Sequence, residues 1–326
     1  MSRFPSLLVA CSLLGATTAA VANPVTIRAG TFLQESDALW YPPIQSFIDE
    51  VKQLSAADPI EIKMVAAGGK GVPVFELGNA VKTGVLDLVM ATGAFFARNV
   101  PIADGHKMST MPVQQERANG IYDFFRPFYA QGLNAYYLGR WGDQVKAHFY
   151  LTKKIDKADF TGLSIRTTNF NQAFVEKLGG RGLQIPPAET YTALERGTLN
   201  GNGWPLWGIG AWGWEKLTKY RIEPGYYTSE INIVINMNTW NKLSEAQKKV
   251  MHTAMQHLED RFAQMREEVT KKELDFQNKA GIQAIVFEGA DREKYLSAAV
   301  DTGWADLMQK DPVNAPKLKA LFEKSR

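Results

Sequence analysis

The sequence predicts an α/β protein of two domains with one long helix lying across both. Strand-like and helix-like segments alternate over residues 23–93, and a second alternating set begins near residue 140. Such alternation is typical of an α/β fold with a largely parallel sheet. A chain of 326 residues is long enough for about two domains.

The first set follows a regular β-α-β-α-β order. Residues 23–32 alternate as a strand, residues 41–55 form a helix with proline at its start, and residues 60–67 form a second strand. Residues 74–84 predict a further helix that ends at a glycine, and residues 85–93 predict a buried strand.

The second set is longer and has less regular spacing. Strands are expected at 147–155, 163–167, 183–187, 230–237 and 281–289, and helices at 169–180 and 188–201. A short helical tail is expected to end the chain.

Residues 243–281 predict one very long helix. Ser244 is its expected N-cap, and Gln247 completes a capping box. Apolar residues keep one face at spacings of three to four: Val250, Ala254, Leu258, Phe262, Met265 and Val269. At 1.5 Å per residue such a helix extends about 50 Å, which is more than the width of one small domain.

The first 22 residues predict a secretory signal peptide. An apolar run follows Arg3 and ends in Ala20-Val21-Ala22, an A-x-A cleavage site before Asn23. A lipoprotein-like "LVAC" at 8–11 is the alternative, in which Cys11 is lipidated. No later run is long enough to span a membrane, so we expect an exported chain that is not itself membrane-spanning.

Composition and motifs argue against several classes of function. The net charge is +3 without basic blocks, which argues against nucleic acid as a partner. Cleavage removes the only cysteine, and the chain has no G-x-S-x-G or H-E-x-x-H motif. A G-x-G-x-x-G at Gly208, Gly210 and Gly213 follows "WPLW" rather than a strand, so we expect no dinucleotide cofactor.

Two neighbouring motifs resemble the solute-binding subunits of tripartite ATP-independent periplasmic (TRAP) transporters, the DctP family. "GLSIR" at Gly162–Arg166 is followed by "PPAETYTALERGTLNG" at 186–201, with the family's order and spacing. "LGNAVKTGVLDLVM" at Leu77–Met90 and the segment Ile231–Met251 are similar to further family segments. The resemblance covers essentially the whole chain after the signal peptide.

The resemblance implies a periplasmic binding protein fold with a hinge and a bridging helix. The expected domain I comprises residues 23–143 and 232–272, and the expected domain II comprises residues 144–231 and 273–326. It also implies a small carboxylate ligand, delivery to the TRAP membrane subunits, and no catalysis. A periplasmic protein that presents its ligand to a sensor is the alternative, since the same fold serves receptors.

Arg166 occupies the position at which the family holds the ligand carboxylate. A planar guanidinium matches a carboxylate with two parallel hydrogen bonds and stays charged in a closed cleft. From the residues alone, a buried ion pair accounts for Arg166 equally well. A supporting position twenty residues upstream falls at Lys146, with Gln144 as a rival.

Trp204 stands where many family members place a ligand-binding asparagine, and we expect it to line the site as a flat apolar wall. The tryptophans at 207, 212 and 214 are expected to be core or hinge packing. Where keto-acid binders of the family carry metal-binding glutamates, this chain has Gly203 and Thr228, although Glu230 lies close. We therefore expect no metal.

Further candidates come from the first domain. The resemblance places Asn79 at a ligand-contacting position. Phe32 and Asp37 follow the first expected strand, and Thr92 and Phe95 follow the third. The carboxyl ends of strands are where the clefts of α/β sheets open.

Overall fold

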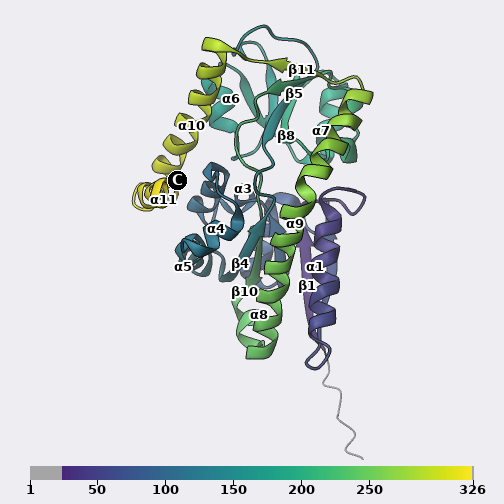
Figure 1. The fold of residues 1–326 in the computed structure, drawn as a ribbon, viewed down its shortest axis with the longest axis vertical. Helices are drawn as coiled ribbons and strands as arrows, with labels where there is room; N and C mark the ends of the chain where they lie inside the picture. Colours follow the sequence, from purple (N-terminus) through teal and green to yellow (C-terminus); the bar gives the residue numbers. More distant parts are fainter. Residues whose placement is uncertain (1–23, 325–326) are drawn as a thin grey trace, which may run out of the picture.

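A computed structural model describes residues 24–324, and two β-sheets organise the chain in it. Figure 1 shows one sheet in the lower lobe, with β1, β4 and β10, and the other in the upper lobe, with β5, β8 and β11. Helices cover both sheets. The predicted α/β fold class is confirmed.

The first sheet contains five strands in the order β2-β1-β3-β10-β4. Their bounds are β2 Ile60–Ala67, β1 Val25–Thr31, β3 Leu88–Ala91, β10 Ile231–Asn236 and β4 Ala135–Trp141. The strands β1, β2 and β3 are parallel, whereas β10 runs antiparallel to both of its neighbours. All six residues of β10 are buried, and its two asparagines, Asn232 and Asn236, donate to the carbonyls of Ala91 and Val81.

Helices and 3₁₀ turns surround this first sheet. They are α1 Tyr41–Leu54, η1 Val74–Glu76, α2 Leu77–Thr83, α3 Gly93–Phe96, η2 Pro101–Met108, α4 Val113–Ala118, α5 Ile121–Leu133 and α8 Met237–Lys242. Proline in the first turn of α1 suits a position whose backbone N–H has no helical partner. Ile44, Phe47 and Val51 form the buried face of α1.

The second sheet contains six strands in the order β11-β9-β5-β8-β6-β7. Their bounds are β11 Gln283–Val286, β9 Tyr220–Glu223, β5 Ala147–Leu151, β8 Gly201–Pro205, β6 Ser164–Thr167 and β7 Arg181–Gln184. β8 is parallel to β6 and antiparallel to β5. The smaller helices of this lobe are α6 Gln172–Lys177, α7 Pro187–Glu195, η3 Ile209–Trp212 and η4 Trp214–Lys216.

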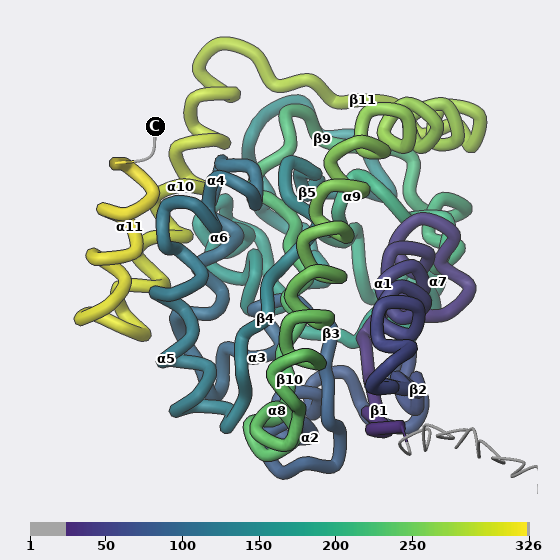
Figure 2. The backbone as a smooth tube through the Cα atoms, turned by 60° about the horizontal axis from the view of Figure 1, so that its bottom comes forward, coloured from purple at the N-terminus to yellow at the C-terminus, as the bar shows by residue number. Residues whose placement is uncertain are grey.

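The predicted long helix is α9, Glu245–Lys279, and it contacts both lobes. Its capping box between Ser244 and Gln247 forms as expected. The N-terminal part packs against α1 and β4 (Figure 2). Near its C-terminus, Gln277 accepts a hydrogen bond from Arg221 of β9 at 2.6 Å and donates one to the Leu206 carbonyl at 2.7 Å.

The C-terminal tail differs from the short helix that was expected. It forms α10, Gly289–Lys310, and α11, Ala315–Lys324. α10 contacts both α6 and η2, and α11 packs against α5 and η2 of the lower lobe (Figure 1). The end of the segment 273–326 therefore lies against the lobe of the first sheet, although the expected domain division placed it in domain II.

Two sequence predictions concern the membrane and the N-terminus. Within residues 24–324, no helix has both the length and the apolar character needed to cross a bilayer. The predicted signal peptide and the alternative lipidation site at Cys11 lie outside the described residues.

Candidate ligand-binding site

A pocket opens between the two lobes, where strands from both sheets end. The centres of water-sized molecules can occupy about 70 Å³ of it, and it is partly open to solvent. Its lining is mainly apolar with a few polar groups, as is typical of small-molecule sites. The lining residues are Phe32, Leu33, Trp40, Thr92, Phe95, Arg166, Thr168, Phe170, Asn171, Gly203, Trp204, Pro205, Tyr226, Ser229, Glu230 and Ile231. Segments that follow β1, β3 and β6, together with β8 itself, meet here, as expected for the carboxyl ends of strands in α/β sheets.

Arg166 is a buried cation in the wall of this pocket. Only 3% of its surface is exposed. Its Nε donates to the Ile185 carbonyl at 2.9 Å, whereas Nη2 is buried without a hydrogen-bond partner. Burial lowers the pKa of Arg166 to about 10, since no acidic neighbour among the described residues offsets the lost hydration. The residues that the structure describes therefore leave the charge of Arg166 without a counter-charge.

Aromatic side chains from both lobes form most of the remaining wall. Phe32 and Phe95 of the first lobe lie 5.2 Å apart between ring centroids, and Phe32 meets the edge of Trp204 at 6.5 Å. Trp214 supports Trp204 from behind in an edge-on contact at 5.0 Å. The Arg166 guanidinium lies 5.6 Å from the centroid of the Trp204 ring. These rings give the pocket a largely apolar surface.

Among the described residues that line the pocket, Glu230 is the one that is acidic. Its Oε1 accepts a hydrogen bond from the Gly93 N–H at 2.7 Å, and its Oε2 accepts one from the Asn232 amide. Burial raises the pKa of Glu230 well above the ordinary value for a glutamate. Glu230 is thus held by the first sheet and does not pair with Arg166.

Gly203 allows two polar side chains to meet in the pocket wall. Asn171 donates to the Tyr226 hydroxyl at 3.0 Å. A Cβ at position 203 would lie 2.1 Å from the Asn171 amide nitrogen and 2.6 Å from the Tyr226 oxygen, so a side chain cannot fit here while this pair is in place. The Asn171–Tyr226 pair therefore takes the space that a glutamate would need.

The structure brings five of the nine predicted ligand-binding residues to the pocket: Phe32, Thr92, Phe95, Arg166 and Trp204. The other four, Asp37, Asn79, Lys146 and Gln144, do not line the pocket, because each bonds to a different partner. Asp37 caps a turn by accepting from the N–H groups of Leu39 and Trp40 at 3.0 Å each, and burial raises its pKa. Asn79 bonds to Glu76 in α2 at 2.8 Å.

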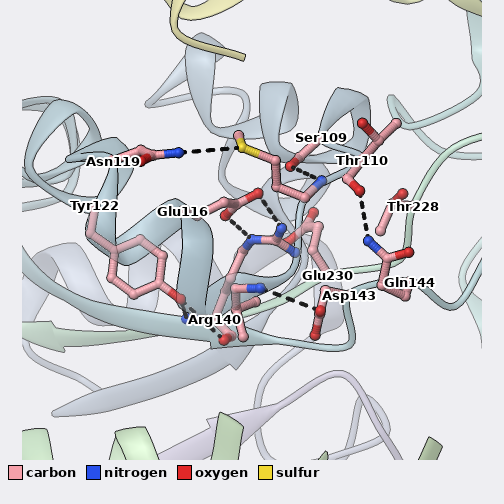
Figure 3. Close-up of polar contacts among 12 residues, drawn as sticks. Ser109, Thr110, Glu116, Asn119, Tyr122, Arg140, Asp143, Gln144, Thr228 and Glu230 are labelled. Atoms are coloured by element: carbon pink, nitrogen blue, oxygen red, sulfur yellow. Dashed lines mark hydrogen bonds and ion pairs between the residues drawn. The ribbon is translucent and has the colours of Figure 1, made fainter. Parts of the chain in front are cut away.

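The two rival positions, Lys146 and Gln144, are also turned to other partners. The Lys146 ammonium donates to the Thr228 hydroxyl at 2.9 Å. The Gln144 amide donates to the Thr110 carbonyl at 2.7 Å, as Figure 3 shows. Neither residue lines the pocket.

The positions of the family's metal-binding glutamates do not fit a cation in this chain. Gly203 has no side chain, and the Thr228 hydroxyl already accepts from Lys146. Within residues 24–324, no group of three or more His, Cys, Asp or Glu side chains is placed to hold a metal. The expected absence of a metal remains a prediction, with Glu230 as the nearest carboxylate.

The remaining tryptophans of the segment pack as expected. Trp207 and Trp214 are fully buried in the main hydrophobic core, and Trp212 packs against that core. Of the G-x-G-x-x-G glycines, Gly208 and Gly213 border two 3₁₀ turns and Gly210 lies within the first of them, so the motif does not open an α-helix.

Sequence reasoning missed much of the pocket, including Phe170, Asn171, Tyr226 and Ser229. These residues lie in irregular segments after β6 and before β10, where periodic patterns give no signal. Glu230 was noted only as a neighbour of Thr228. An indirect signal was available for Gly203, since a glycine in place of a glutamate implies that another group fills that space.

Together, the two sheets, the pocket between them and the helix that crosses both define a two-lobed binding protein. The chain belongs to the bacterial extracellular solute-binding proteins, family 7, whose family model matches residues 36–311. The resemblance found in the motifs around Arg166 is thereby confirmed.

Individual relatives are more distant. The 2,3-diketo-L-gulonate-binding periplasmic protein of Escherichia coli is 28% identical over 169 residues, which is 51% of this chain and 51% of that protein. The match thus spans about half the length of that relative. A monocarboxylate 2-oxoacid-binding periplasmic protein of Nostoc is 26% identical over 104 residues, which is 30% of this chain and 28% of that protein.

Solved structures agree in fold. A TRAP solute-binding protein from Desulfovibrio salexigens with bound orotic acid has a TM-score of 0.81 at 19% identity, covering 92% of this chain and 98% of that one. One from Bordetella bronchiseptica, with copurified calcium and picolinate, also has a TM-score of 0.81, at 22% identity, covering 93% and 92%.

Proposed function

We propose that this protein captures a small carboxylic acid between its lobes and delivers it to TRAP membrane subunits. One observation carries the proposal. Arg166 is a buried guanidinium with a free donor and no acidic partner among the described residues, and it lies in the wall of the pocket between the lobes. A bound carboxylate supplies both the missing acceptor and the missing charge.

Binding without turnover follows from the same chemistry. The pocket offers one cation, one carboxylate that bonds to its own lobe, and aromatic walls. The predicted signal peptide at 1–22 and the periplasmic relatives favour the periplasm as the compartment. Incubation of the protein with its ligand should leave that ligand chemically unchanged.

Calorimetric titration of Arg166→Ala tests the proposal. Truncating one partner of a buried ion pair costs roughly 2–5 kcal/mol, so we expect at least about a thirtyfold loss of affinity for any carboxylate that the wild type binds. Arg181→Ala is the matched control, since Arg181 is exposed on the adjacent strand β7 and should leave the affinity unchanged. Equal binding by Arg166→Ala and wild type would refute the role of Arg166.

A further inference from the structure

The charges of the pocket limit the charge of its ligand. Arg166 is the only lysine, arginine or histidine among the lining residues, and Glu230 is the only aspartate or glutamate. One ligand carboxylate neutralises Arg166. A second carboxylate would enter a buried site without a second cation, and burying an unpaired charge is strongly unfavourable.

The free hydrogen-bonding groups of the pocket limit its polarity. Asn171 is engaged, since it donates to Tyr226 at 3.0 Å and accepts from the Thr168 N–H at 3.2 Å. Both oxygens of Glu230 already accept hydrogen bonds.

Three buried atoms on lining residues remain unpartnered: Arg166 Nη2, Trp204 Nε1 and Ser229 Oγ. All three can donate a hydrogen bond, and Thr92 adds one hydroxyl. A carboxylate has about four acceptor positions, which matches this number of donors. The hydroxyls of Tyr226 and Thr168 accept hydrogen bonds within the wall and keep one O–H each to donate. A sugar acid with several hydroxyl groups would therefore lose more hydrogen bonds to water than the pocket replaces.

The walls favour a flat body for the ligand. Phe32 and Phe95 project from one lobe, and Phe170, Trp204 and Tyr226 from the other. Aromatic faces and edges pack best against another planar ring. We propose that this site takes a monocarboxylic acid with a flat apolar body, an aromatic monocarboxylate in chemical class. This inference rests on the proposed function and narrows it.

Three matched pairs of acids test the class by calorimetric titration of the intact protein. 4-Methylbenzoate against terephthalate exchanges a methyl group for a second carboxylate. Hexanoate against gluconate adds hydroxyl groups to a six-carbon chain. 4-Methylbenzoate against 4-methylcyclohexanecarboxylate removes the planarity. We expect the first member of each pair to bind with a dissociation constant at least tenfold lower.

The outcomes separate this inference from the proposed function. Equal or tighter binding of terephthalate, gluconate or the cyclohexane acid than of its partner overturns the class. If Arg166→Ala no longer binds the acid that overturned the class, the proposed function still stands, because binding of that acid depends on Arg166. If no carboxylate binds in a manner that depends on Arg166, both proposals fail.

Trp204→Leu gives a second readout at the wall itself. It should reduce the preference for 4-methylbenzoate over the cyclohexane acid to less than threefold, since the planar surface is lost. Trp304→Leu is the control, because Trp304 packs on Phe322 outside the pocket. An unchanged preference in Trp204→Leu would show that Trp204 does not select for a flat body.

Discussion

Two buried arginines, one in each lobe, have opposite surroundings. Arg140 of β4 has no exposed surface, and its Nε and Nη2 donate to the two carboxylate oxygens of Glu116, as Figure 3 shows. This pairing outweighs burial and raises the pKa of Arg140 above its ordinary value. Arg166 of β6 is 3% exposed and has no acidic partner among the described residues, so that burial lowers its pKa to about 10.

The difference separates a structural charge from a functional one. The fold provides the counter-charge for Arg140, so its ion pair is complete in the absence of any ligand. Arg166 carries the cost of burial without compensation, and the lobes hold it beside an open pocket. Burial and residue type are nearly the same in both cases, and only the presence of a partner distinguishes them.

The largest expected effect is on stability, at the paired arginine. Arg140→Met leaves the Glu116 carboxylate buried without a cation, which should lower the free energy of unfolding by about 3–5 kcal/mol. Urea denaturation measures this. Arg166→Met is the comparison, and its free energy of unfolding without ligand should stay within about 1 kcal/mol of wild type or rise, since no partner is stranded. Equal losses in both variants would contradict the distinction.

A smaller loss is expected in affinity when the charge of Arg166 is kept. Arg166→Lys retains the cation but replaces the planar pair of donors with a compact ammonium. We expect a loss of about 2–3 kcal/mol in binding free energy, or about 30- to 150-fold in affinity. Titration with the tightest acid of the panel measures it. Full affinity in Arg166→Lys would mean that charge alone holds the ligand.

The role of Arg166 could be predicted because two motifs, at Gly162–Arg166 and 186–201, resemble those of a known family in sequence and in spacing. The long helix across both lobes was also correctly predicted, since a capping box marks its start and an apolar face continues over many turns. Both features depend on residues that are close together in the sequence, so they can be predicted without knowledge of distant contacts.

Features that depend on distant contacts were not predicted. β8, Gly201–Pro205, contains two glycines and a proline, which disfavour a strand, yet it pairs with β5 and β6 inside the second sheet. Asp37 follows a strand as a site residue would, but its carboxylate caps a turn. No pattern in one sequence distinguishes these outcomes, because the deciding partners lie elsewhere in the chain.

A buried carboxylate extends the comparison to pH. Glu273 of α9 is 5% exposed and forms no ion pair with any described residue, and burial raises its pKa to about 7. The folded state therefore binds its proton more tightly than the unfolded state, so this residue lowers stability as pH rises from about 4.5 to about 7.

Glu273→Gln should remove this loss. We subtract the free energy of unfolding of wild type from that of the variant at each pH. This difference should be about 1–2 kcal/mol larger at pH 8 than at pH 5. Glu267→Gln, an exposed position on the same helix, should show no such change. The same pH profile for Glu273→Gln and wild type would show that Glu273 is not the titrating group.

The smallest effect is expected at Lys146, the basic residue that the sequence offered as a support for the ligand. Its ammonium donates to Thr228 at 2.9 Å and does not line the pocket. Lys146→Met should therefore change the affinity for the tightest acid by less than about threefold, while the lost hydrogen bond lowers the free energy of unfolding by about 1 kcal/mol. Thr228→Val removes the same hydrogen bond and keeps the charge. It should also change the affinity by less than about threefold, and it should lower the free energy of unfolding at least as much, since the Lys146 ammonium loses its partner. If Lys146→Met weakens binding tenfold or more and Thr228→Val does not, the Lys146 charge reaches the ligand, and Arg166 is then not the only cation that serves it.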